Sequence, residues 1–351
     1  MSNKPSFAYL KISGSPFEAG QALGRFGAQA VHEHLLHSKA WAGVMGWRGS
    51  ERVARMAALV QARFPRVWSE LQGLASGLQL PLGDVFLWNC RGDLWAMSPD
   101  GCTTVQIPGS GVQRISHNED GDPGFTGRCA MAEFAVDDSP GFASFVYPGS
   151  IPGHTFAVTQ QGLAITVNNL RELSVDAGMP RMVLTRALLE LATQDEVVRL
   201  LQAQPRAGGF HLSVAQRGCA HLLSIEFSSA ACSVRTVEAP ALHANHAIHP
   251  AMQGFPQLIT ESSRRRQLRG DALLAQAIEG GSAIQPLNIL ADAQDPAFPI
   301  YRKDPADSDD ENTQATADIV VRDTHVDWLV YERPQDPPRF RMTDGHAQSP
   351  L

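Results

Sequence analysis

The chain has 351 residues, of which 43% are hydrophobic, and a formal charge of −7 at pH 7. This length allows two domains or one large layered domain, and the apolar fraction is sufficient for a substantial core. The acidic balance and the lack of a basic stripe argue against nucleic acid as a partner, and no apolar run is long enough to cross a bilayer.

The amino-terminal stretch "MSNKPSFAYLKISGSP" has no apolar signal-peptide core, so we expect a cytoplasmic protein. The five cysteines are widely scattered and form no CxxC pair, which argues against a zinc ribbon or a disulfide framework. They are Cys90, Cys102, Cys129, Cys219 and Cys232.

The first hundred residues are predicted to be mostly helical. A helix should begin near residue 15, where Ser-Pro followed by a Glu is a typical start. A second helical stretch covers residues 51–78, and Pro65 is expected to kink or split it. A short third helical stretch leads through residues 81–97 towards Cys102.

After Cys102 the pattern changes to short β-rich runs separated by Gly, Pro and Asp. One clear helix is predicted over residues 179–204, and more strands follow it. A further helix from residue 261 to about 278 and two strands within residues 317–334 complete the pattern. Strands in two blocks with helices between and around them predict an α+β layered sandwich of antiparallel sheets.

The acidic, polar stretch over residues 303–318 is predicted to be a solvated loop, and a loop over a functional site is the alternative.

Several kinds of site lack their motifs. The chain has no G-x-S-x-G elbow, no S-x-x-K and no glycine-rich phosphate loop. Histidines at three-residue spacing in "HANHAIH", together with His117, Glu119 and Asp120, could in principle bind a transition metal. Pro250 interrupts any helix that would align the three, so we expect histidines of a polar surface loop and no metal. The three are His243, His246 and His249.

The dipeptide Gly101–Cys102 raises a different possibility. If the peptide bond between them is cut, Cys102 becomes an amino terminus whose α-amine, with a pKa of about 7.7–8.0, can take the thiol proton. A glycine before the thiol, in what is expected to be an Asp-Gly turn, tolerates strained backbone and leaves its carbonyl open to attack. From these residues alone, a structural cysteine remains the simpler explanation.

Eight stretches in order resemble the isopenicillin N (acyl-CoA:6-aminopenicillanic acid) acyltransferases. This family of N-terminal-nucleophile hydrolases is related to the bile-salt hydrolases and penicillin V acylases. The resemblance spans nearly the whole chain. The stretches are "ISGSPFEAGQALG", "ELQGLASGLQLPLGDVFLWNCRGDL", "GCTT", "SHNEDGDP", "GLAITVNNL", "MPRMVLTRALLE", "HANH" and "ILADAQD".

The resemblance implies a four-layer αββα fold and self-cleavage into two chains, residues 1–101 and 102–351, that together form one compact unit. Cys102 matches the family's nucleophile, Asp120 the aspartate that holds the free amine or its neighbours, and Asn245 the asparagine that donates to the oxyanion. Asn169 matches a second site asparagine, with the adjacent Asn168 as the alternative register.

The resemblance is weaker at two places. Arg302, in "PIYRKDP", is the best match to a family arginine, but the flanking residues differ from the usual Cys-Arg-His. Gly121 and Asp122 stand where the family often has an aromatic residue, which alters the expected pocket wall. Thr103 and His117 are candidates for substrate binding, with a structural role as the alternative.

We therefore predict a self-processing cysteine amidohydrolase or acyltransferase acting on a small N-acyl amide or acyl thioester. The expected intermediate is a thioester at Cys102, and the acceptor is water or an amine. No cofactor is expected, although acyl-CoA is a possible co-substrate. The chain's own cleaved amino-terminal piece is an expected partner, and the oligomeric state is left open. The alternatives are an uncleaved binding protein, an uncleaved thiol hydrolase with a histidine base, and a true penicillin-forming acyltransferase.

Overall fold

The computed structural model describes residues 7–97, 100–174, 176–254, 256–304 and 306–348. Its helices are α1 (Pro16–Glu33), α2 (Lys39–Met45), α3 (Glu51–Arg63), α4 (Pro65–Leu78), α5 (Leu82–Trp88), α6 (Arg91–Leu94), α7 (Arg181–Leu188), α8 (Gln194–Ala203), α9 (Glu261–Glu279) and α10 (Pro286–Leu290).

The strands are β1 (Ala8–Gly14), β2 (Asp100–Ile107), β3 (Val112–Gly121), β4 (Ala130–Val136), β5 (Phe142–Val146), β6 (Phe156–Thr159), β7 (Leu163–Leu170), β8 (Gly209–Gln216), β9 (Leu222–Phe227), β10 (Cys232–Thr236), β11 (Ala241–His243), β12 (Asn312–Arg322), β13 (Val326–Tyr331), β14 (Phe340–Thr343) and β15 (His346–Ala347).

The predicted start of the first long helix is confirmed. The Ser15 side chain accepts a hydrogen bond from the backbone N–H of Glu18, and the Glu18 carboxylate accepts one from the backbone of Ser15, which forms a capping box. Pro65 stands at the first turn of α4 and separates it from α3, as predicted. A Cβ on Gly20 would overlap the backbone carbonyl of Glu70, so glycine allows α1 and α4 to pack closely.

Eight strands form the first sheet in the order β1-β4-β5-β6-β7-β8-β9-β10, antiparallel except for the β1–β4 pair. The second sheet has the order β11-β2-β3-β12-β13-β14-β15 and is antiparallel. Polar side chains join the two sheets, because Gln106 of β2 donates to Ser213 of β8 and Thr104 of β2 donates to Asn168 of β7.

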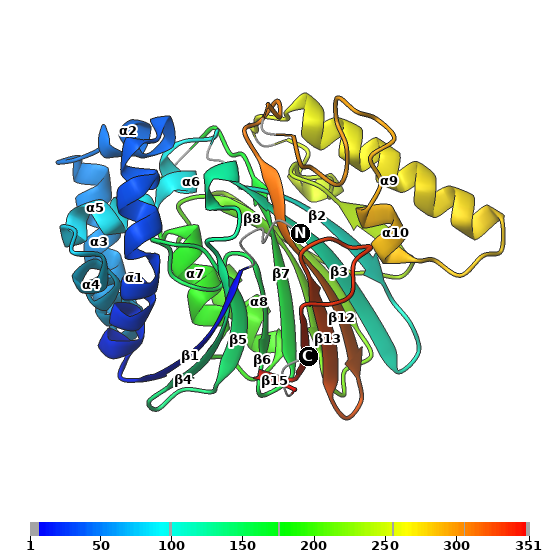
Figure 1. Ribbon diagram of the computed structural model, residues 1–351, viewed down its shortest axis with the longest axis horizontal. Coiled ribbons are helices and arrows are strands. Elements are labelled where there is room, and N and C mark those ends of the chain that lie inside the picture. Colours follow the sequence, from blue (N-terminus) through cyan, green and yellow to red (C-terminus); the bar gives the residue numbers. More distant parts are fainter. Residues whose placement is uncertain (1–6, 98–99, 175, 255, 305, 349–351) are drawn as a thin grey trace, which may run out of the picture.

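Helices cover the outer sides of both sheets (Figure 1). Helix α1 contacts β1 and β4, and α8 contacts β8 and β10, all in the first sheet. Helix α9 packs on β11, and α10 packs on β2 and β3, in the second sheet. This mixed architecture with two largely antiparallel sheets is consistent with the predicted sandwich.

Some predicted elements are wrong. The single helix expected over residues 179–204 is two helices, α7 and α8, because Thr193 and Glu196 form a capping box that starts a new helix. Strand β1 and helix α2 were not predicted. The stretch over residues 303–318 is not a solvated loop throughout, since β12 begins at Asn312 and Glu311 is fully buried.

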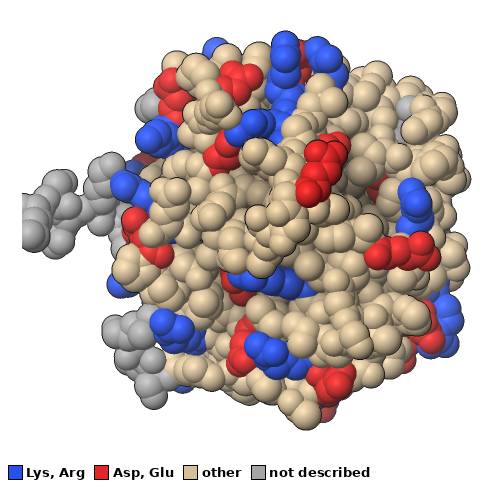
Figure 2. Space-filling model, turned by 90° about the vertical axis from the view of Figure 1, so that its right-hand side faces the viewer, with Lys and Arg blue, Asp and Glu red and all other residues tan. Residues whose placement is uncertain are grey.

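Among the described residues, no helix combines the length and apolar character needed to cross a membrane. On the face seen in Figure 2, basic and acidic side chains are interspersed between wide uncharged areas. The part of that face drawn in colour therefore presents no broad field of a single sign.

Candidate active site

Gly101 and Cys102 lie at the beginning of β2, where the strand pairs with β3. Gly101 stands opposite Asp120, and Cys102 opposite Glu119. The expected Asp-Gly turn is wrong, because Asp100 and Gly101 are already paired in the strand. The Cys102 side chain is buried, with 3% of its surface exposed.

Both backbone polar groups of Cys102 are held by side chains. Its N–H donates to Asn245 Oδ1 at 3.0 Å, and its carbonyl oxygen accepts from Arg266 Nη1 at 2.6 Å. Arg266 also donates to Asn245 Oδ1 at 2.6 Å through its other terminal nitrogen, and to the Thr103 hydroxyl at 2.9 Å. The residues following β11 and the first turns of α9 therefore converge on this one residue of β2.

Asn245 presents its carbonyl oxygen, and not its amide nitrogen, to Cys102. Its Nδ2 donates to the backbone carbonyl of Asn169 at 3.3 Å, and its own N–H donates to Ser263 at 2.9 Å. In the uncut chain Asn245 thus binds the nitrogen that cleavage would turn into an amine. The oxyanion role predicted from the resemblance remains a prediction.

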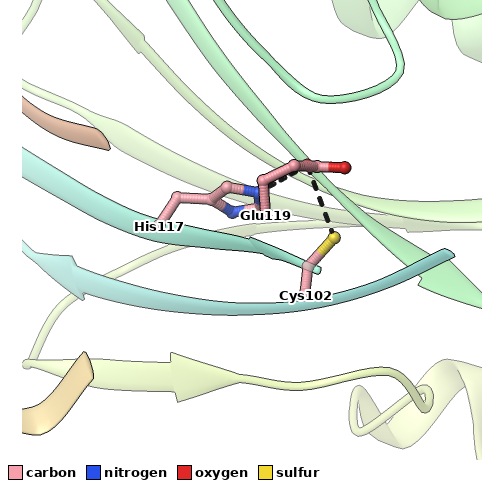
Figure 3. Close-up of side chains that lie close together, drawn as sticks. All are labelled: Cys102, His117 and Glu119. Carbon is pink, nitrogen blue, oxygen red and sulfur yellow. Dashed lines mark hydrogen bonds and ion pairs between the residues drawn. The ribbon is translucent and has the colours of Figure 1, made fainter. Parts of the chain in front are cut away.

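The thiol of Cys102 faces a row of buried polar groups (Figure 3). Its Sγ donates to Glu119 Oε2 at 3.8 Å, and the same oxygen lies 3.1 Å from His117 Nε2. Burial lowers the pKa of His117 to about 3, so the imidazole is neutral. The donor atoms of these three residues all lie within 4.8 Å of one another. A divalent ion could bridge that spacing, but in this chain hydrogen bonds join the three directly.

A cluster of buried charges surrounds Gly101. Glu311 pairs with Arg302 and, at 2.6 Å, with Arg171. A Cβ on Gly101 would overlap the Glu311 carboxylate and lie 3.0 Å from Arg302, so only glycine fits beside this ion pair. Close approach of the charges, and not a positive φ, therefore explains the glycine.

Asp120 belongs to the same cluster. Its Oδ1 accepts from the Thr313 hydroxyl at 2.7 Å, and its Oδ2 lies 3.9 Å from Arg302. Burial raises the pKa of Asp120 to about 6, although the neighbouring Arg302 guanidinium opposes this shift. Burial lowers the pKa of Arg302, but Glu311 and Asp120 outweigh this effect and the net shift is upward.

The two adjacent asparagines of β7 have different environments. Asn169 accepts from Arg181 at 2.6 Å through its side chain, and only its backbone carbonyl reaches Asn245. Asn168 accepts from Thr104 at 2.7 Å and donates to the backbone carbonyl of His243 at 3.0 Å. Asn169 is therefore the one in contact with Asn245, while Asn168 lies behind the thiol in the row that contains His117.

The remaining predicted residues are engaged inside the protein. Thr103 and His117, proposed as substrate-binding groups, are both fully buried. His243 and His249 are also buried, so the expected polar surface loop is wrong for them. His243 pairs with the buried carboxylate of Glu226 at 2.8 Å, which explains why it can leave the surface.

Sequence reasoning missed three residues of this site: Glu119, Arg266 and Glu311. Glu119 was considered only as a possible metal ligand, although its place two residues after His117 puts both side chains on one face of a strand. Arg266 is one of three consecutive arginines, and nothing in that run marks the buried one. Glu311 lies within the stretch predicted to be solvated.

A cavity of about 690 Å³ lies beside the charged cluster. Its walls include Tyr301, Arg302 and Thr313, but Cys102 is not among its lining residues. The described residues thus bury the thiol away from this cavity in the uncut chain.

Two other cysteines are core residues. Cys90 and Cys129 are buried, and burial raises the pKa of each thiol well above its usual value. Both thiols are therefore protonated and poor nucleophiles near neutral pH.

Comparison with known proteins supports the resemblance. A search of curated proteins found no match. Residues 108–335, well over half of the chain, match the family described as acyl-coenzyme A:6-aminopenicillanic acid acyl-transferase. This region contains Asp120, Asn169, Asn245 and Arg302 but begins after Cys102. The chain belongs to this acyltransferase family.

Proposed function

We propose that the chain is a self-processing enzyme of the N-terminal-nucleophile fold, with Cys102 as its nucleophile. It would cut its own Gly101–Cys102 bond and then act on amide or thioester substrates. The observation that carries this proposal is the convergence on that one peptide bond: Asn245 and Arg266 hold the cysteine backbone, and Glu311 fits against the glycine.

Cleavage begins when the Cys102 sulfur attacks the carbonyl carbon of Gly101. The S–C bond forms, the C–N bond breaks, and the thiol proton ends on the nitrogen, so the peptide becomes a thioester with a free amine. Water then hydrolyses the thioester and separates residues 1–101 from residues 102–351. The hydrogen bond from the Cys102 nitrogen to Asn245 Oδ1 would be retained by the new amine.

In the cut enzyme the α-amine of Cys102 becomes the local base, because with an ordinary pKa of about 7.7–8.0 a useful fraction of it is uncharged near neutral pH and can take the thiol proton. The thiolate attacks an N-acyl compound or an acyl thioester such as acyl-CoA, and the acyl group passes to water or an amine. Arg302 and Asp120 would keep the cavity side of the site charged and ordered. Donation from Asn245 to an oxyanion would require its Nδ2 to exchange the bond to Asn169.

The direct test is the intact mass of the purified chain under denaturing conditions. Scaling 38.0 kDa by 101 of 351 residues gives expected fragments of about 11 and 27 kDa. A single full-length species that does not change on standing contradicts self-processing. Assays with N-acyl amides, acyl thioesters and β-lactams then identify the substrate class.

One alternative has an observation in its favour. The row Cys102–Glu119–His117 could support an uncleaved thiol hydrolase, since a carboxylate and an imidazole lie behind the thiol. Full-length protein that turns over an acyl substrate would establish this alternative, and full-length protein that binds but does not turn over would establish a binding protein.

A further inference from the structure

Self-cleavage needs a proton acceptor that the uncut chain must supply by itself. Before the cut, the nitrogen of Cys102 is an amide, and its N–H already donates to Asn245 Oδ1. An amide nitrogen has no basic lone pair, so the α-amine that serves the mature enzyme does not yet exist. Another group near the sulfur must therefore take the thiol proton for the first cleavage.

The protons of the buried row behind the thiol can be assigned from its hydrogen bonds. Asn168 Nδ2 donates to a carbonyl, so its Oδ1 is the acceptor of the single Thr104 hydroxyl proton. The contact of 2.8 Å between Thr104 and His117 Nδ1 then requires Nδ1 to carry a proton and donate. Neutral His117 therefore has its lone pair on Nε2.

That lone pair lies 3.1 Å from Glu119 Oε2. Two lone pairs do not face each other at this distance in a buried site, so one proton is shared between Oε2 and Nε2. The pair is neutral as a whole, and because the imidazole is neutral the proton lies on the carboxyl group of Glu119, which donates it to Nε2. The same Oε2 accepts from the Cys102 thiol at 3.8 Å.

We propose that Glu119 and His117 together accept the thiol proton for self-cleavage: Glu119 is the catalytic group that touches the thiol, and His117 takes the proton that Glu119 already holds. The S–H bond breaks, the proton binds Glu119 Oε2, and the proton already shared moves to His117 Nε2. The resulting thiolate attacks the Gly101 carbonyl carbon. The pair then returns one proton to the nitrogen of Cys102 as the C–N bond breaks, so no external acid or base is consumed.

This inference rests on the proposed self-processing, but it makes a separate claim. Glu119 should matter far more for the first cut than for later turnover, because the free α-amine of Cys102 replaces it once the bond is broken. A residue needed only for folding or substrate binding would not separate the two rates in this way.

The test follows the full-length chain after a pulse of cell-free synthesis, with gel analysis of its conversion into two pieces. Glu119→Gln should slow cleavage by about 10²-fold or more, the usual contribution of a general base. The amide of Gln can still donate to His117 Nε2, so this variant should fold. Glu70→Gln is the matched control, since Glu70 is an equally buried glutamate that pairs with Arg186 in the helical layer, and it should cleave at the wild-type rate.

Two further readouts exclude a merely structural effect. The small fraction of Glu119→Gln that does cleave should turn over acyl substrates within a few-fold of the wild-type rate. Its cleavage should also rise with hydroxide concentration, in contrast to the flatter pH profile of the wild type. If Glu119→Gln does not fold, Glu119→Asp serves instead. Its side chain is shorter by one methylene, so its carboxylate lies farther from the thiol and cleavage should be slower in a folded chain.

The outcomes are distinguishable. A wild-type chain that never cleaves contradicts the proposed function itself. If the wild type cleaves and folded Glu119→Gln cleaves at the same rate, the role of Glu119 is overturned. The same holds for folded Glu119→Asp where that variant takes its place. Equal losses of cleavage and mature turnover overturn it as well.

Discussion

Two buried ion clusters in this molecule have similar chemistry and different surroundings. Glu70 of α4 pairs with Arg186 of α7 at 2.8 Å, and both side chains are 1% exposed. Glu311 pairs with Arg302 and Arg171, and its side chain is fully buried. The first cluster joins two helices, whereas the second touches Gly101, the residue before the thiol. A buried charge by itself therefore does not indicate a functional site, whereas contact between that charge and a reactive group does.

The largest contrast is expected between two buried cysteines. Cys102→Ala should abolish both self-cleavage and turnover, because no sulfur remains to form the thioester. Cys90→Ala should leave both intact, since Cys90 lies in the core with a pKa raised by burial. Intact mass and an acyl-substrate assay check both variants, and cleavage in Cys102→Ala would assign the nucleophile elsewhere.

The two ion clusters can be compared directly. Glu311→Gln and Glu70→Gln each remove one carboxylate from a buried arginine that keeps another acidic partner, Asp307 for Arg302 and Glu190 for Arg186. Each should therefore cost about 1–3 kcal/mol of stability. Only Glu311→Gln should also slow self-cleavage, since it disturbs the groups around Gly101. Urea unfolding and the rate of cleavage measure the two effects. Equal slowing in both variants would mean that cleavage responds to global stability alone.

Two glycines provide a finer comparison. Gly101→Ala places a methyl group on the Glu311 carboxylate and should slow cleavage by about 10²-fold through a displaced scissile bond. Gly20→Ala places its methyl group on the backbone of α4 and should cost about 1–3 kcal/mol of stability without changing the chemistry. Cleavage time courses and thermal unfolding separate the two, and a fast-cleaving Gly101→Ala would show that the glycine serves packing alone.

The most gradual predicted effect is a dependence of stability on pH. The pKa of Asp120 is raised from 3.8 to about 6, so the folded chain holds this proton more tightly than the unfolded chain. Its contribution to stability is therefore fully present below about pH 4 and is lost as the pH rises through 6. Asp120→Asn should gain stability relative to the wild type over that window, by up to about 3 kcal/mol. Urea unfolding from pH 4 to 7 checks this, and a difference independent of pH contradicts it.

Local patterns predicted the elements whose signals are local. Ser15 and Glu18 mark the start of α1, and Pro65 marks the boundary between α3 and α4, because capping and proline act within one helical turn. The break between α7 and α8 was overlooked although Thr193 and Glu196 carry the same kind of signal. Strand β1 was missed because its pairing partner, β4, lies more than a hundred residues away.

The residues of the candidate site also divide into those predicted from local motifs and those found only in the folded structure. The sequence by itself singled out Cys102, Asp120, Asn245 and Arg302 as candidates, because short motifs in a family order locate residue types without any knowledge of their contacts. Only the tertiary structure placed Glu119 against the thiol, Arg266 on the backbone of Cys102 and Glu311 beside Gly101. These contacts join strands, a helix and a loop far apart in the chain. Burial and neighbouring charges together shift the pKa of Asp120 and of Arg302, and both are properties of the folded molecule.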